Sequence, residues 1–119
     1  MLEKKVVQDI KKFLIANYPG VWEKIHGSGY QRAGISDLIG CHKGRFIAIE
    51  VKTPKTKNNV SELQKKFIRD VQEAGGIAFV AWDVDMVKEV MEKEFKGENK
   101  TCLKKGIKSS TKKIIRSTK

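Results

Sequence analysis

Three charged residues in the middle of this sequence have the types and the spacing that phosphate chemistry requires. Asp37 is followed thirteen residues later by the tripeptide Glu50-Val51-Lys52. Because side chains alternate between the two faces of a β-strand, Glu50 and Lys52 share one face if this segment is extended. Two carboxylates supply the hard oxygen ligands that Mg²⁺ or Mn²⁺ prefers, and a lysine beside them can contact a phosphate. The pattern therefore predicts metal-assisted hydrolysis of a phosphodiester.

A β-hairpin is the element that must bring these groups together. Two predicted strands, Ser36–Cys41 and Arg45–Thr53, are separated by a glycine-containing turn. When the turn is centred on Lys43-Gly44, Asp37 and Glu50 become approximate cross-strand partners. Their Cβ atoms are then expected roughly 5 Å apart. Two carboxylates at that separation repel each other unless a cation lies between them.

The expected roles of these residues follow from their chemistry. A metal held by Asp37, Glu50 and the backbone carbonyl oxygen of Val51 lowers the pKa of a bound water and neutralises charge on the phosphate. Lys52 orients the attacking hydroxide or stabilises the pentavalent phosphorus. A pair of solvated surface charges is the alternative interpretation, because a Glu-x-Lys tripeptide alone is weak evidence. The cross-strand aspartate, the apolar strand and the glycine-rich lead-in from Gly34 favour the catalytic one.

The flanking segments predict a mixed α/β sandwich around one central sheet. Helices are expected over residues 2–17, 62–74 and from Asp83 or Asp85 to about Phe95, with additional strands over Val21–Ile25 and Ile77–Trp82. The resulting order is α, β, β, β, α, β, α. The second helix follows a predicted N-cap serine. Its apolar stripe, expected to face inward, consists of Leu63, Phe67, Val71 and Ala74.

Length, composition and charge restrict the class of protein. The 119 residues suffice for one modest domain, predicted over residues 1–95. The sequence has no apolar run long enough for a membrane span, no secretory signal and two distant cysteines, which favours a cytoplasmic protein without a disulfide framework. The net charge of +11 lies mainly in a basic C-terminal tail, residues 96–119. Such a tail attracts polyphosphates or is a solvated extension, and both interpretations stay open.

The order of these motifs resembles the VRR-NUC family, a branch of the PD-(D/E)XK nuclease superfamily. The resemblance covers about residues 1–90 and rests on Gly34-x-x-Asp37-Leu-Ile-Gly40, on the segment from Gly44 to Pro54, on Ser61-x-x-Gln64 and on Ala74-Gly75-Gly76. It implies a restriction-endonuclease-like αβββαβ core with a mixed central sheet. It also implies a Mg²⁺-dependent DNA endonuclease for junctions, flaps or forks. Stand-alone members of the family are expected to be homodimers and are often phage-encoded, so the resemblance also implies a homodimer in a bacterial or phage-infected cell.

This sequence departs from the family at one place next to the site, where Ser36 precedes Asp37 and the family usually has proline. The resemblance also implies catalytic roles for Glu3, an outer or second-metal ligand, and for Gln64, a polar contact within the active site. Each residue has a structural alternative. Glu3 is a favourable charge at a helix N-terminus, and Gln64 completes a capping box with Ser61.

Several cationic and aromatic side chains are candidates for contact with nucleic acid. The candidates for backbone phosphates are Arg32, Arg45, Lys55, Lys57, Lys65 and Lys66. Trp22, Tyr30 and Trp82 are candidates for base stacking, although the position of Trp82 at the end of an apolar strand favours the core. His26 is placed to border the substrate groove. The principal alternative function is a catalytically silent nucleic-acid-binding domain of the same fold.

Overall fold

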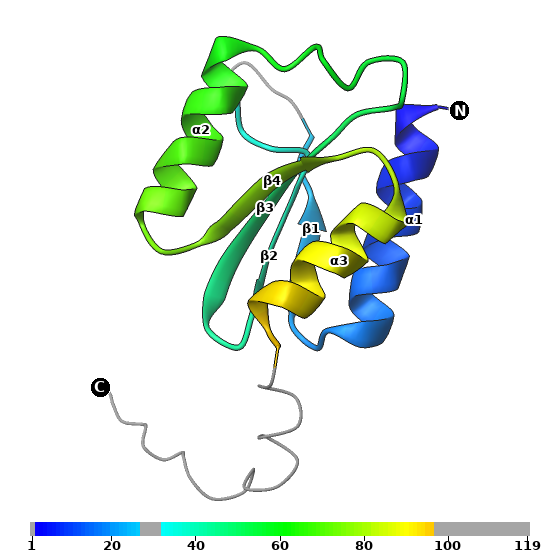
Figure 1. The fold of residues 1–119 in the computed structure, drawn as a ribbon, viewed down its shortest axis with the longest axis vertical. Coiled ribbons are helices and arrows are strands. Elements are labelled where there is room, and N and C mark those ends of the chain that lie inside the picture. Colours follow the sequence, from blue (N-terminus) through cyan, green and yellow to red (C-terminus); the bar gives the residue numbers. More distant parts are fainter. Residues whose placement is uncertain (1, 27–31, 97–119) are drawn as a thin grey trace, which may run out of the picture. The chain divides into compact units, whose positions relative to one another are not determined.

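The computed structural model describes residues 2–26 and 32–96 (Figure 1). The elements are α1 (Glu3–Asn17), β1 (Val21–Lys24), β2 (Leu38–His42), β3 (Arg45–Val51), α2 (Glu62–Glu73), β4 (Ile77–Ala81) and α3 (Val84–Glu94). The predicted order of helices and strands is confirmed, with bounds that differ by one or two residues. The described chain divides into two compact units, with the boundary between residues 87 and 88.

The first unit contains a four-stranded sheet in the order β1-β2-β3-β4. β2 pairs antiparallel with β1 and β3, whereas β4 pairs parallel with β3. The sheet is therefore mixed, as predicted, and the parallel pair is connected through α2. Figure 1 shows α1 and α2 on opposite faces of this sheet.

The β2–β3 hairpin has the register that the sequence predicted. Leu38 pairs with Ile49 and His42 with Arg45. Lys43 (φ 52°) and Gly44 (φ 81°) both have positive φ. Positive φ at both central residues is typical of a type I′ turn, whose twist matches that of the flanking strands. Since the turn fixes the register of a two-residue hairpin, the pairing continues to place Asp37 opposite Glu50.

The two faces of β3 are buried by different parts of the unit. Ala48 packs in one cluster with Val71 of α2 and Ala78 of β4, so it faces α2. Ile47 and Ile49 alternate with it and are fully buried on the other face, which α1 covers. Glu50, two residues after Ala48, therefore emerges on the face of α2, at the end of an otherwise apolar row.

The inward stripe of α2 differs from the prediction. Val71 is buried and Phe67 is half-buried, but Leu63 is 53% exposed and Ala74 is exposed. At the first turn of the helix the polar side chain of Gln64 reaches the sheet instead, because it donates a hydrogen bond to Glu50. The hydrophobic periodicity predicted Leu63 on the inward side because this pattern counts only apolar residues and so gives no weight to Gln64.

The N-terminus of α3 confirms one of two predicted caps. The carboxylate of Asp83 accepts a hydrogen bond from the backbone N–H of Met86 at 2.9 Å, which makes Asp83 the N-cap and Asp85 a first-turn residue. The second unit contributes residues 88–96 to the described chain. The predicted basic tail beyond Lys96 lies outside the described residues, and the predicted domain boundary after residue 95 stays a prediction.

None of the helices in the described segments combines the length and the apolar character needed to cross a membrane.

Candidate active site

Asp37 lies at the point where the chain enters β2. Its backbone carbonyl accepts a hydrogen bond from the N–H of Ile25 at 2.7 Å, so the β1–β2 pairing extends to the backbone of Asp37. Its side-chain Oδ2 accepts the backbone N–H of Val51 at 2.8 Å. The carboxylate thus reaches across to β3, at the level of Glu50, and is fixed by a charge-assisted hydrogen bond.

Glu50 is a buried carboxylate with an unusual environment. Its side chain is 2% exposed. Burial first, and then the negative charge of Asp37, raise the pKa of Glu50 to about 8, while Lys52 opposes the shift. Its Oε1 atom is buried and has no hydrogen-bond partner among the described residues. A carboxylate oxygen in that position is costly unless a cation or a proton satisfies it.

Lys52 follows the last residue of β3, on the same face as Glu50. Its backbone N–H donates to the carbonyl of Ala81 at 3.0 Å, which continues the parallel pairing with β4. Its Nζ lies 3.6 Å from Oε2 of Glu50, and the lysine side chain is only 11% exposed. The parallel pairing thus places a largely buried ammonium group next to the carboxyl group of Glu50.

Gln64 forms the predicted capping box and also contacts Glu50. Its Oε1 accepts the backbone N–H of Ser61 at 2.8 Å, while the Ser61 hydroxyl accepts the N–H of Gln64 at 3.1 Å, which is a complete capping box. Its Nε2 donates to Oε2 of Glu50 at 2.8 Å. One side chain thus caps α2 and fixes the orientation of the buried carboxylate.

Gly34 allows this approach between the Asp37 segment and α2. It has a φ of 88°, which favours glycine. A Cβ at this position would lie 2.5 Å from the carbonyl oxygen of Leu63 and 3.0 Å from the backbone nitrogen of Gln64. The glycine-rich lead-in noted in the sequence therefore has a structural reason: the chain before Asp37 lies directly against the first turn of α2.

The donor atoms fit a small divalent cation. Asp37 and Glu50 supply two carboxylates, and Oε1 of Glu50, which has no hydrogen-bond partner among the described residues, is open to a cation when the carboxyl group is ionised. A residue in a strand directs its N–H and C=O to the same side, so the carbonyl of Val51, whose N–H binds Asp37, also faces that carboxylate. Among residues 2–26 and 32–96, no three His, Cys, Asp or Glu side chains form a metal-binding group. The set suits Mg²⁺, which keeps several waters and is bound by one or two carboxylates and substrate phosphates.

Glu3, the first residue of α1, is exposed. Its charge contributes the smallest of the effects that raise the pKa of Glu50. It therefore lies near enough for its charge to act on the site, but it does not complete a three-carboxylate group with the other two acids among the described residues. Its proposed role as an outer or second-metal ligand stays a prediction.

The predicted phosphate contacts are dispersed over the surface. Arg32 binds Asp70 at 2.7 Å and lies over the ring of Phe67. Lys57 lies over the ring of Trp82, at 5.2 Å. Lys65 forms an ion pair with Glu62, and Lys66 forms one with Asp70. Of the remaining two candidates, Lys55 is exposed and Arg45 is half-buried.

The aromatic candidates for base stacking are only partly supported. Trp22 is 5% exposed, and its Nε1 donates to the carbonyl of Tyr18, so it belongs to the core. Trp82 is half-buried, and Tyr30 lies outside the described residues. Sequence reasoning missed Phe46, which is 41% exposed. The available signal was strand alternation, since Phe46 shares the face of Glu50.

A mixed sheet whose hairpin presents two carboxylates and a lysine at one end defines a restriction-endonuclease-like nuclease core. The chain belongs to the VRR-NUC family, since the model of the VRR-NUC domain matches residues 1–85. The match includes the hairpin and the capping box of α2, and it implies a nuclease. No curated protein matches this chain.

Proposed function

We propose that this protein is a Mg²⁺-dependent or Mn²⁺-dependent endonuclease that hydrolyses phosphodiester bonds in DNA. The buried Glu50 carboxylate carries the proposal. It lies beside Asp37 and Lys52, and one of its oxygens has no partner among the described residues. A protein does not maintain this costly arrangement for stability, because two adjacent carboxylates destabilise the folded state. Perturbed carboxylates of this kind cluster at functional sites.

The proposed reaction divides the work among the four residues of the site. A bound divalent cation would supply a water of lowered pKa and would neutralise charge on the phosphate. Asp37 and Glu50 would hold that cation, and Glu50 would have to lose its proton first. Gln64 fixes the Glu50 carboxylate through Oε2, which leaves Oε1 available. Lys52 contacts the attacking oxygen or the phosphate, because its ammonium group is held at the same carboxylate.

Substrate preference, assembly and compartment belong to the same proposal. We expect a preference for junctions, flaps or forks, a homodimer with two-fold symmetry and a cytoplasmic location. The first two expectations come from what the resemblance to the family implies, and the third comes from the composition of the sequence. A two-fold dimer would direct two sites to the two strands of a symmetric substrate.

The test is cleavage of plasmid, single strands, flaps and four-way junctions with Mg²⁺, Mn²⁺ or EDTA. Asp37→Asn and Glu50→Gln are expected to abolish cutting and to leave binding largely intact, while Asp9→Asn serves as the matched control. Asp9 is an acid on α1 whose ion pair with Lys5 is remote from the site. Normal cutting by the first two variants refutes the proposed site. Binding without cutting by the native chain would indicate a catalytically silent nucleic-acid-binding domain.

A further inference from the structure

A row of exposed apolar side chains crosses the face of the sheet that carries the carboxylates. Val21 of β1 pairs with Cys41 of β2, and Cys41 pairs with Phe46 of β3, so the three side chains are neighbours on one face. Val21 is 60% exposed, Phe46 is 41% exposed and Cys41 is also exposed. α2 packs against β3 and β4 on this face. Within the part of the chain that the structure describes, no helix therefore covers the half of this face over β1 and β2.

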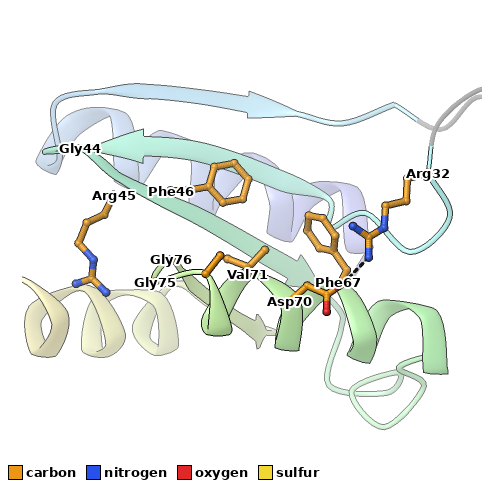
Figure 2. Close-up of a pocket in the computed structure, with 10 residues that line it drawn as sticks. Arg32, Gly44, Arg45, Phe46, Phe67, Asp70, Val71, Gly75 and Gly76 are labelled. Carbon is orange, nitrogen blue, oxygen red and sulfur yellow. Dashed lines mark hydrogen bonds and ion pairs between the residues drawn. The ribbon is translucent and has the colours of Figure 1, made fainter. Parts of the chain in front are cut away.

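A groove of about 410 Å³ lies between this row and α2 (Figure 2). Its walls come from the hairpin, from α2 and from the turn after α2, and the side chains that matter here are Arg32, Arg45, Phe46, Phe67, Asp70 and Val71. Figure 2 shows Arg45 at one end and Arg32 at the other, with the two phenylalanine rings between them. The groove thus combines an aromatic floor with a cation at each end.

The Arg32 end remains cationic although Arg32 forms an ion pair. The carboxylate of Asp70 lies 2.7 Å from Arg32 and 3.0 Å from Lys66. Two positive charges share one negative charge, so a net positive charge remains at this end. A phosphate can approach it without breaking the ion pair.

The groove is on the same face as the active site and in line with it along β3. Phe46, Ala48 and Glu50 alternate on that face, so the ring of Phe46 is displaced from the carboxylates by about 13 Å along the strand. We propose that the groove binds an unpaired nucleobase of the substrate strand, stacked on Phe46, with its neighbouring phosphates at Arg45 and at the Arg32 end. This inference rests on the proposed nuclease function and adds a substrate class, strands with an unpaired segment close to the cut.

The lining favours nucleic acid over a second copy of the chain. Stable protein interfaces use roughly 20–30 residues a side, whereas the exposed apolar row contains three side chains. Aromatic rings that alternate with cations are the usual lining for single-stranded nucleic acid, since every base has a π-face and every nucleotide has a phosphate. A base inside a duplex is covered by its neighbours, so only an unpaired base can stack on Phe46.

The first test is binding of a labelled single-stranded oligonucleotide by fluorescence anisotropy, in EDTA so that no strand is cut. Phe46→Ala is expected to weaken binding by at least about 5-fold, and Phe46→Trp to restore it. Ile15→Ala is the matched control. Ile15 is an exposed apolar residue on α1 (59% exposed), on the opposite side of the sheet. Equal affinity for Phe46→Ala and Ile15→Ala overturns the inference.

The second test uses the native chain and does not depend on the folding of a variant. An abasic site is moved through the oligonucleotide one position at a time. One position is expected to reduce binding as much as Phe46→Ala does, and that abasic site should have no further effect in the variant. An abasic scan without such a position overturns the inference.

The outcomes separate this groove from the nuclease function itself. A native chain that binds single strands but cuts no substrate refutes the nuclease and leaves the groove supported by the binding data. A chain that cuts normally after Phe46→Ala, with unchanged affinity, refutes the groove alone. If Phe46→Ala instead converts a dimer to a monomer in analytical ultracentrifugation with unchanged oligonucleotide affinity, the row is an interface between copies and the inference is wrong.

Discussion

The two ends of the β2–β3 hairpin differ in what they bury: one end buries ionisable side chains, and the other leaves apolar side chains exposed. At the open end, three ionisable side chains lie close together in buried or half-buried positions: Asp37, Glu50 and Lys52. Hydrogen bonds from Val51 and Gln64 restrain the two carboxyl groups. At the turn end, apolar side chains stay in contact with solvent.

Burial of charge at the first end costs stability and is useful only if a ligand compensates for it. Exposure of apolar surface at the second end is similarly unfavourable without a partner. The comparison shows that one strand can carry both a buried carboxyl group and an exposed aromatic ring on one face. Side-chain alternation directs Phe46, Ala48 and Glu50 to that face, and the buried Ala48 separates the other two.

The largest effect should come from breaking the open end. Asp37→Asn removes a negative charge from the proposed metal site and weakens the acceptor for the N–H of Val51. A bound metal lowers the activation barrier by several kcal/mol, so the rate of cleavage should fall on the order of 10³-fold when the metal is lost. Single-turnover cleavage of a flap substrate at saturating Mg²⁺ measures the rate for this variant and for the native chain. A fall below tenfold would mean that Asp37 is not a ligand.

Glu50→Gln should stabilise the metal-free protein, and the gain should depend on pH. The pKa of Glu50 is raised to about 8 in the folded protein, from an ordinary value near 4.5. The folded state therefore binds a proton that the unfolded state has released, and its stability falls as pH rises through this window. Glutamine has no proton to lose. The variant should gain on the order of 3 kcal/mol over the native chain above pH 8 and nothing below about pH 4.

Urea unfolding in EDTA at pH 4, 6 and 8.5 measures this difference. Asp9→Asn, at a carboxylate remote from the site, controls for the loss of an acid in general. A difference that is the same at all three pH values would show that folding does not raise the pKa of Glu50, and that burial of its carboxylate at the open end of the hairpin carries no pH-dependent cost.

Gln64 connects the site to α2, and two substitutions separate its functions. Ser61→Ala breaks the capping box alone and should cost about 1 kcal/mol of stability. Gln64→Ala breaks the capping box and the hydrogen bond to Glu50. It should therefore lose similar stability and, in addition, about 10- to 100-fold in apparent metal affinity, as outer contacts to metal ligands usually do.

Mg²⁺ titrations of cleavage with both variants test this separation. If Ser61→Ala lowers the metal affinity as much as Gln64→Ala, then the position of α2, and not the contact between Gln64 and Glu50, controls the carboxylate.

The same comparison shows which parts of the structure a sequence can predict. The register of Asp37 and Glu50 followed from the position of a two-residue turn, because a local geometric rule fixes it. The inward side of α2 was predicted incorrectly at Leu63, since a polar side chain with a partner 14 residues away took the inward position. The groove beside Phe46 could not be predicted, because it depends on how far α2 covers the sheet. Only the tertiary placement of the helix determines that coverage.

The smallest effect is expected at Ser36, which directly precedes Asp37 at the open end of the hairpin. Ser36 is 1% exposed, and its hydroxyl has no hydrogen-bond partner among the described residues. Removing a buried unpaired polar group relieves its desolvation cost and leaves only a small space. Ser36→Ala should therefore change the free energy of unfolding by no more than about 0.5 kcal/mol, or raise it, with unchanged cleavage. A loss of cleavage with retained stability would show that this hydroxyl contacts the substrate or the metal-bound water, and would extend the functional end of the hairpin by one residue.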